Sequence, residues 1–313
     1  MSISPYPSEP VNTDETADSP EPIPTSQPGQ STEYPEVAAG VSVSARRGVR
    51  RYQSEIAKLL ANPLDRKTTL ESLSNPAVRR SAISGCLAAT WNGHRVVIKR
   101  PSFLARVPLD QLLPVRRLGS NPDARSNLCI HTTRRGSVPH VVWAESKLEA
   151  LWMVELDRLH GDYESQACAL VWPVGERMVI QFPDLVVRSG STTAIWSVRS
   201  ARRRSEYASF MLSVLIPETA AAHGLSYHLA GDISLQRAAN LRVMDALRWK
   251  SSVTSQSGWA NVVATRPTTL GAVVEAAGGG AYGRAIALRG LAQVHYDTDL
   301  ERPFGRTSAV VWR

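Results

Sequence analysis

The order of polar and apolar residues between Glu145 and Arg199 is the feature that most constrains the fold of this chain. In its first part, ESKLEALWMVELDRL (Glu145–Leu159), apolar residues recur at the spacing of one helix face. They are Leu148, Leu151, Trp152, Leu156 and Leu159. The second part, FPDLVVRSGSTTAIWSVR (Phe182–Arg199), holds two β-branched runs around a Gly-centred turn. The segment therefore predicts an amphipathic helix and a later β-hairpin, with Asp184 opening its first strand.

Further runs rich in β-branched and aromatic residues predict a sheet around this helix. The predicted strands are Ser165–Pro173, Met178–Phe182, Asp184–Arg188, Thr192–Arg199 and Tyr227–Ala230. Before the last of them we expect a helix from about Arg203 to His223, kinked at Pro217 and ended by Gly224. The order of helix, strands, helix and strand predicts an α/β fold with a mixed central sheet flanked by helices.

Composition and turn signals divide the chain into four segments. They are a Pro/Ser-rich acidic tail (1–44), an N-terminal helical and hairpin region (45–126), the α/β core (127–233) and a C-terminal helical region (234–313). The tail has almost no bulky aliphatic residues, so it is predicted to be disordered. In the second segment we expect a helix at Arg51–Ala61, a second helical stretch, and a hairpin at Leu87–Lys99 with a two-residue Asn92-Gly93 turn. Gly119–Ser126 is predicted to be a polar loop.

The C-terminal segment predicts a small winged-helix-like domain. Leu235–Trp249 has helical spacing, and the Ser/Thr-rich run Lys250–Pro267 is expected to be a linker. Two short helices separated by Gly278-Gly279-Gly280 should follow. His295–Asp299 and Ser308–Trp312 are then expected to pair as a β-hairpin.

The charge of the chain is distributed unevenly. The net charge is +8, yet Met1–Gly40 carries seven acidic and no basic residues, so the remainder carries +15. A basic body suits a phosphate backbone, because each neutralised phosphate releases a counterion. We therefore expect double-stranded DNA as a partner. The acidic tail would either compete with DNA for this body or act as a solubilising extension.

Cysteines, tryptophans and hydropathy add further expectations. Cys86, Cys129 and Cys168 lie far apart without a metal-ligand spacing, which indicates reduced, buried thiols. Five tryptophans are expected to anchor the core: Trp91, Trp143, Trp152, Trp172 and Trp196. No membrane span and no signal peptide are predicted. We expect a cytoplasmic protein that is nucleoid-associated when bound to DNA.

The polar residues of the central segment suit hydrolysis of a phosphodiester. Mg²⁺ can neutralise the developing charge and generate hydroxide when one or two carboxylates hold it. Glu149 and Asp184 are the natural ligands, and Glu145 is the alternative to Glu149. The hairpin should bring Ser197 and Arg199 close to Asp184, directly across or diagonally. Gln166, on an earlier strand, could present its amide to a metal-bound water.

Several of these sequences resemble a known family. ESKLE, the Gln166 strand, FPDLVV and SVRSA are similar to the TnsA-like heteromeric transposase endonuclease subunits of actinobacterial type, in the PD-(D/E)XK restriction-endonuclease-like superfamily. The resemblance extends to PVRRLGS, HVVWAESKLE and ALRGLAQVHYDTDLERPFG, and so covers about Pro114–Arg313. The family's catalytic positions fall on Glu149, Asp184, Ser197 and Arg199. Ser197 stands where an acid or amide is usual and Arg199 where Lys is usual.

The resemblance implies a function and partners. Such subunits cut one DNA strand at each transposon end in a metal-dependent reaction, while an integrase-type transposase and a helper ATPase act with them. Two alternatives stay open, a non-catalytic DNA-binding scaffold and a restriction or repair nuclease on the same fold. Taken singly, Glu149 also fits a solvated helix residue, Asp184 a turn residue, and Arg199 the start of a solvated basic helix.

Overall fold

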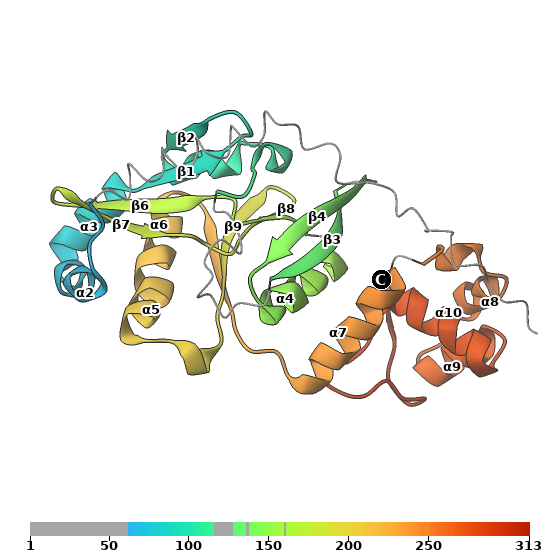
Figure 1. Cartoon of the computed structure of the whole chain (residues 1–313). Coiled ribbons are helices and arrows are strands. Elements are labelled where there is room, and N and C mark those ends of the chain that lie inside the picture. Colours follow the sequence, from blue (N-terminus) through green and yellow to red (C-terminus); the bar gives the residue numbers. More distant parts are fainter. Residues whose placement is uncertain (1–61, 116–127, 136–137, 160, 249) are drawn as a thin grey trace, which may run out of the picture. The chain divides into compact units, whose positions relative to one another are not determined.

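The central sheet of the protein has four strands and mixed direction (Figure 1). Its strands are β5 (Asp162–Ser165), β8 (Leu185–Ser189), β9 (Thr192–Val198) and β10 (Ser226–Ala230), in the order β10-β9-β8-β5. β5, β8 and β9 are antiparallel neighbours, whereas β10 runs parallel to β9. This computed structural model describes residues 62–115, 128–135, 138–159, 161–248 and 250–313. The predicted disordered tail, the predicted helix at 51–61 and the loop at 119–126 lie outside the described residues.

Helices cover both faces of this sheet, as the α/β prediction requires. Helix α4 (Lys147–Arg158) packs Met153 and Leu156 against Leu185 and Val187 on one face. On the other face, Val186 and Ile195 contact the helical stretch of α5 (Glu206–Phe210), a π-helical turn (Met211–Leu215) and α6 (Ile216–Ala222). The π turn directly precedes Pro217, which lacks an N–H for the regular ladder. The predicted long helix is therefore present with its irregularity beside the predicted kink.

A second four-stranded sheet combines an N-terminal hairpin with a hairpin inserted between β5 and β8. Its order is β2-β1-β6-β7, from β1 (Leu87–Trp91), β2 (Val96–Lys99), β6 (Ala169–Val174) and β7 (Arg177–Gln181). The 3-10 helices Pro101–Ala105 and Leu109–Gln111 follow β2. Helices α2 (Arg66–Ser74) and α3 (Pro76–Gly85) bury Leu73 and Ile83 in the cluster that also contains Trp172.

Three local predictions were wrong. Ser165–Pro173 is not one strand, since Gln166 adopts a φ of 50° and the chain passes from β5 to β6 in the other sheet. The β1–β2 hairpin has a four-residue loop, because Trp91 pairs with Val96. On α4 the buried residues include Glu149, Met153, Val154 and Glu155, whereas Leu159 is 47% exposed. The helix is packed on two sides, so its buried surface is wider than the predicted stripe.

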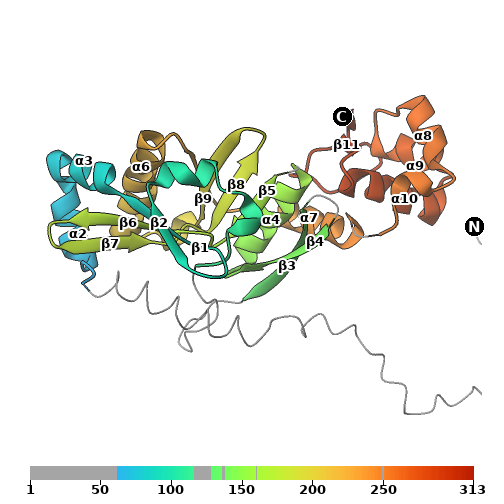
Figure 2. The same cartoon turned by 90° about the horizontal axis from the view of Figure 1, so that it is seen from above.

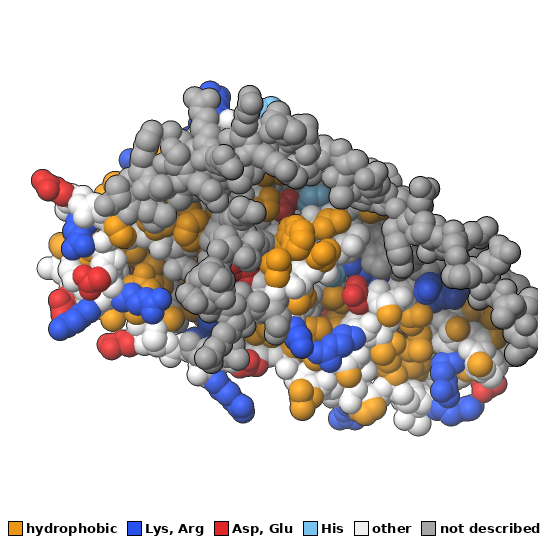
Figure 3. Space-filling model, viewed as in Figure 1, with side chains coloured by type: hydrophobic (Ala, Val, Ile, Leu, Met, Phe, Trp, Pro, Cys, Tyr) orange, Lys and Arg blue, Asp and Glu red, His pale blue; other side chains and the backbone are white. Residues whose placement is uncertain are grey.

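The hairpin of β3 (Cys129–Arg135) and β4 (Val138–Ala144) lies beside β5. Its inner face buries His131, Val142 and Ala144. Its outer face exposes Ile130 (65%), Val141 (46%) and Trp143 (37%), and Figure 3 shows hydrophobic side chains at the surface in the region of this hairpin. Trp143 is therefore not the core anchor that the sequence suggested, whereas Trp91 and Trp172 are buried.

The C-terminal region consists of helices and a short strand pair (Figure 2). The helices are α7 (Leu235–Arg248), α8 (Trp259–Thr265), α9 (Leu270–Ala276) and α10 (Gly280–Ala292), with a 3-10 turn at Val253–Ser255. β11 (Tyr296–Asp297) pairs with β12 (Val311–Trp312), so the predicted hairpin is confirmed. The predicted linker is wrong, because its Val253, Trp259 and Val262 are buried in the core of this region. Within the described ranges no helix is both long and apolar enough to span a membrane.

The cysteines partly match their prediction. Cys86 and Cys168 are buried free thiols, and Cys129 is half-buried. Burial raises the pKa of both buried thiols to about 12, so they stay protonated.

Candidate functional site

Glu149 lies in the first turn of α4 and is buried, with 6% of its surface exposed. Ser146 caps the helix: its Oγ accepts from the Glu149 N–H at 3.1 Å and donates to Glu149 Oε1 at 3.0 Å. The Glu145 N–H donates to Glu149 Oε2 at 2.8 Å. The sequence Ser-x-x-Glu is the signature of a capping box, but here the Glu149 carboxylate accepts from the N–H of Glu145 and the hydroxyl of Ser146 instead of from the N–H of the N-cap residue. Glu149 is thus not the solvated helix residue of the simpler interpretation.

Asp184 lies directly before β8 and is also buried, at 8% exposure. Its N–H donates to Trp196 O at 3.0 Å, and its Oδ2 accepts from the Val198 N–H at 2.6 Å. The β8–β9 register pairs Leu185 with Trp196, so Asp184 stands opposite Ser197. The turn between these strands consists of Gly190 and Ser191, and Gly190 has the positive φ, 56°, that this tight turn requires. The predicted hairpin is confirmed, and it positions Asp184 opposite Ser197 of β9.

The two carboxylates lie close enough to affect each other's ionisation. The pKa of Glu149 is raised from its usual 4.5 to about 7, first by burial and second by the negative charge of Asp184. Hydrogen bonds from Glu145 and Ser146 act in the opposite direction, and the charge of Glu145 is a smaller contribution. Two acids brought together in a poorly hydrated place cannot both ionise freely. Such a pair is a candidate for binding a cation.

Gln166 follows β5 and is joined to Asp184 through the backbone. Its N–H donates to Asp184 O at 2.9 Å, and its own carbonyl accepts from the Val115 N–H at 2.7 Å. Its side chain is 1% exposed, and neither amide atom has a hydrogen-bond partner among the residues that the structure describes. A buried, unpaired amide and a strained φ are both costly, and such costs often mark a functional site.

Ser197 belongs to this site, whereas the Arg199 side chain does not contact the acids. Ser197 is 2% exposed on β9 opposite Asp184. Arg199 follows β9, its N–H donates to Ala230 O, and its side chain is exposed. No ion pair within the described ranges joins Arg199 to either carboxylate. The structure therefore brings together Glu149, Asp184, Gln166 and Ser197. The Arg199 side chain, which was expected to supply a positive charge in the site, is exposed at the surface.

One residue that the sequence did not single out lies near Asp184. The pKa of the Tyr227 phenol is raised, first by burial and also by the Asp184 charge, while a hydrogen bond with Ser197 and the charge of Arg204 act to lower it. Tyr227 is on β10, opposite Ile195 of β9. The parallel pairing of β9 with β10 brings it here, and no motif indicated this pairing.

The donor set suits a hard cation better than a soft one. Two carboxylates and an amide oxygen are the ligands that Mg²⁺ accepts in proteins, with water completing its shell. Among the residues that the structure describes, no group of three or more His, Cys, Asp or Glu side chains could hold a metal ion. At the candidate site the acids available to a cation are Glu149 and Asp184. Glu145 is half-buried and acts on Glu149 only weakly, so Glu149 is the better candidate ligand.

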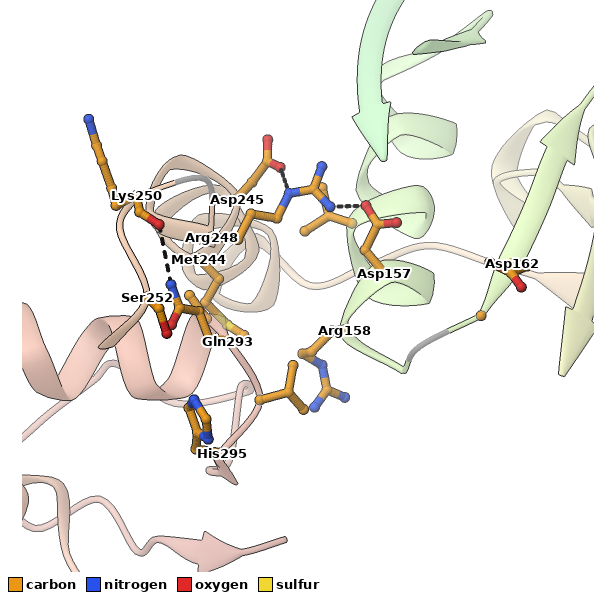
Figure 4. A pocket seen from close by; sticks show the side chains of 14 residues that line it. Asp157, Arg158, Asp162, Met244, Asp245, Arg248, Lys250, Ser252, Gln293 and His295 are labelled. Carbon is orange, nitrogen blue, oxygen red and sulfur yellow. Dashed lines mark hydrogen bonds and ion pairs between the residues drawn. The ribbon is translucent and has the colours of Figure 1, made fainter. Parts of the chain in front are cut away.

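A cavity of about 500 Å³ lies elsewhere, between α4, α7 and the end of α10 (Figure 4). None of the predicted site residues lines it. Its arginines are already paired, Arg158 with Glu155 and Asp297, and Arg248 with Asp157 and Asp245. Paired charges of this kind join elements and leave little binding capacity for a ligand. We therefore place the candidate site at the carboxylate pair.

Comparison of the chain with protein-family models and with curated proteins gave no match.

Proposed function

We propose that this protein is a magnesium-dependent DNA endonuclease subunit of a heteromeric transposase, similar to the TnsA-like subunits. It would hydrolyse one strand of double-stranded DNA at transposon ends, together with an integrase-type transposase and a helper ATPase. The observation that carries this proposal is the buried pair of Glu149 and Asp184, in which burial and mutual charge raise the pKa of Glu149 to about 7. An added cation would relieve both effects.

Each residue of the site has a defined task in this proposal. Glu149 and Asp184 would hold the metal, which would supply charge neutralisation and an activated water. The buried amide of Gln166, next to Asp184, would be available to orient a water. Ser197 orients water or phosphate from β9. Arg199 is exposed next to β9, from where it would contact the transition-state charge when DNA covers this surface.

The order of elements supports a restriction-endonuclease-like core. Helix α4 is followed by the antiparallel strands β5, β8 and β9, then by the α5–α6 stretch, and β10 returns parallel to β9. The acids stand at the start of α4 and directly before β8, as the resemblance requires. For the C-terminal helices with the β11–β12 pair, we propose a winged-helix-like domain that engages the partner proteins.

The first test is cleavage of supercoiled DNA with Mg²⁺, with the partner transposase present. We expect Asp184→Ala to lower metal-dependent nicking by ~10³-fold or more, as loss of a metal ligand or of a major electrostatic contribution does. Asp162→Ala, an exposed acid at the other end of β5, is the matched control and should cleave as wild type. Equal activity of Asp184→Ala and wild type would reject the assigned site.

A second candidate function is a non-catalytic DNA-binding scaffold on the same fold. The observation that favours it is that Glu149 and Asp184 already accept hydrogen bonds, from Glu145, Ser146 and Val198. Ser197 also lacks the charge of an acidic ligand. Calorimetric titration with Mg²⁺ separates the two candidates. The nuclease should bind Mg²⁺, and Asp184→Asn should abolish that binding. The scaffold should show no such Asp184-dependent binding. A gene neighbourhood without transposase and ATPase genes would instead favour a restriction or repair nuclease.

A further inference from the structure

A surface groove of about 610 Å³ lies between α3, α6 and the start of the 3-10 helix Pro101–Ala105. Helices α3 and α6 pack against each other at this place (Figure 1). None of the residues of the Glu149–Asp184 site lines the groove. It is therefore a separate feature, and it is open at the surface because its wall residues Arg80, Ser84 and Ala222 are exposed.

Two arginines, Arg80 and Arg100, supply the charge of this groove. Both are exposed, and within the described ranges neither side chain forms an ion pair or a hydrogen bond. The acid that lines the groove, Glu218, is already paired with Arg79 at 3.0 Å. The positive charges of Arg80 and Arg100 are therefore not compensated by that acid.

The simplest structural role for these arginines is to bind carbonyl groups at the helix ends, as basic side chains often do. Here the Ile83 carbonyl, near the end of α3, accepts from the Cys86 N–H at 3.1 Å and from His223 Nε2 at 3.2 Å. Arg100 directly precedes the 3-10 helix, and its side chain makes no capping hydrogen bond. Helix capping does not account for either guanidinium.

The other lining residues suit an anion that approaches from outside. Ser84 lies four residues after Arg80 and so shares its flank of α3, and Ser102 follows shortly after Arg100. Both hydroxyls can donate hydrogen bonds. Pockets for small organic ligands are lined mainly by apolar and aromatic side chains, whereas no Phe, Tyr or Trp lines this groove. Guanidinium and hydroxyl groups without a large apolar surface match the oxygen atoms of a phosphate backbone.

We propose that this groove between α3 and α6 binds the phosphate backbone of duplex DNA, as a contact separate from the Glu149–Asp184 pair. The identity of the polyanion rests on the proposed function. Arg80 and Arg100 each contact one phosphate, and Ser84 and Ser102 donate to phosphate oxygens beside them. Contacts of this kind hold and orient the duplex without reading its sequence. The charge of +15 on the chain beyond Gly40 favours the same partner.

The test measures affinity for a labelled DNA duplex by fluorescence anisotropy, over a range of salt concentrations and with EDTA to prevent cleavage. Arg80→Gln and Arg100→Gln should each reduce the slope of log K against log salt by about 0.9, one phosphate contact. The same slope gives a loss of affinity of about 8-fold at 0.1 M salt relative to 1 M. Arg80→Lys and Arg100→Lys should keep the wild-type slope, because they keep the charge.

A matched control separates the groove from the total charge of the protein. Arg284 is an exposed arginine on α10 outside the groove, so Arg284→Gln removes the same charge elsewhere and should bind DNA as wild type. A loss for Arg284→Gln equal to that for Arg80→Gln would show that only net charge matters and would overturn the proposal. A wild-type slope in the Lys variants, together with a reduced slope in the Gln variants, assigns the effect to charge rather than to folding.

Further outcomes separate this inference from the proposed function. With Mg²⁺, the double variant Arg80→Gln/Arg100→Gln should need more DNA for half-maximal cleavage at an unchanged maximal rate, because the groove does not contain the carboxylate pair. If Asp184→Ala abolishes cleavage while the arginine variants bind DNA as wild type, the endonuclease stands and the groove is rejected. If Asp184→Ala changes nothing while the arginine variants weaken DNA binding as stated, the groove stands without the nuclease.

Two other anions are tested in the same assay. Calorimetry measures binding of inorganic phosphate and of a synthetic peptide of residues 1–40, which carries seven acidic and no basic residues. If Arg80→Gln abolishes binding of either one but leaves DNA affinity unchanged, the groove serves free phosphate or an acidic segment. Either result would overturn the assignment to DNA.

Discussion

At the scale of single residues, the most unusual group is the Glu149 carboxyl. Burial and the charge of Asp184 raise its pKa to about 7. Hydrogen bonds from the Glu145 N–H and the Ser146 hydroxyl lower this pKa, and the charge of Glu145 raises it slightly. A carboxyl that releases its proton near neutral pH can respond to a bound cation by becoming fully ionised. The same property makes the stability of the metal-free protein depend on pH.

The stability of the metal-free protein should fall as pH rises from about 4.5 to about 7. The folded state binds one proton at Glu149 that the unfolded state has released in this window, so the contribution is present below the window and lost above it. The loss is on the order of 3 kcal/mol in the free energy of unfolding. Urea titrations of wild type and Glu149→Gln across this range measure it.

The Glu149→Gln variant should lack this decline, and Glu206→Gln, an exposed acid on α5, should retain it. With Mg²⁺ present, wild type should be stabilised more at pH 8 than at pH 5.5, since only the ionised pair binds the cation. A pH slope of Glu149→Gln equal to that of wild type would contradict the assignment.

At the scale of elements, the N-terminus of α4 joins helix capping to the candidate site. Ser146 accepts from the Glu149 N–H and donates to the Glu149 carboxylate. One residue therefore stabilises both the start of the helix and the charged form of the acid. The local sequence Ser-x-x-Glu is sufficient for the cap. The raised pKa of Glu149 comes from the tertiary structure, first from burial and second from the charge of Asp184.

Ser146→Ala should have two separable effects. It should lower the free energy of unfolding by about 1 kcal/mol, the usual cost of a lost N-cap. It should also raise the pKa of Glu149 further, because a hydrogen bond that favours the ionised form is gone. Ser205→Ala removes the comparable N-cap of α5, where no carboxylate of the pair takes part, and should show only the stability loss. NMR titration of the labelled carboxyl would detect the shift, and equal behaviour of both variants would refute the link.

At the scale of the whole molecule, buried ion pairs connect α4 with the C-terminal region. Glu155 is 3% exposed and accepts from Arg158 at 2.7 Å and from Arg237 of α7 at 2.8 Å. Arg158 also pairs with Asp297 of β11, and Arg237 with Glu301. The helix that carries Glu149 is thus held by charges from α7 and from the chain around β11.

Removing the central acid of this network should be strongly destabilising. Glu155→Gln removes the buried acid that Arg158 and Arg237 share and leaves each arginine with a more exposed partner, Asp297 or Glu301. We expect a cost of about 3 kcal/mol, the low end for a broken buried pair. Glu275→Gln is the matched control, because Glu275 forms a single exposed pair with Arg306 and should change stability by less than about 1 kcal/mol. Chemical denaturation of the two variants compares them. A cost for Glu155→Gln no larger than for the control would show that the network is not a structural link.

The sequence by itself determined the elements whose signals are local. The Gly190 turn and its flanking β-branched runs specify the β8–β9 hairpin, and the Gly278–Gly280 run separates α9 from α10 as predicted. Ser197 could therefore be placed near Asp184 in advance, directly across or diagonally, and the register shows that it is directly across. In these places, the residues that set the backbone angles are adjacent in the chain.

Only the tertiary structure decided which distant elements meet. β1 pairs with β6, the run predicted as a linker buries Trp259, and Gln166 ends one strand instead of continuing it. Tyr227 lies near Asp184 because β10 pairs with β9, a contact between segments about thirty residues apart. Long-range pairing and desolvation depend on how all elements pack together, and the pKa of Glu149 follows from that packing rather than from its neighbours in sequence.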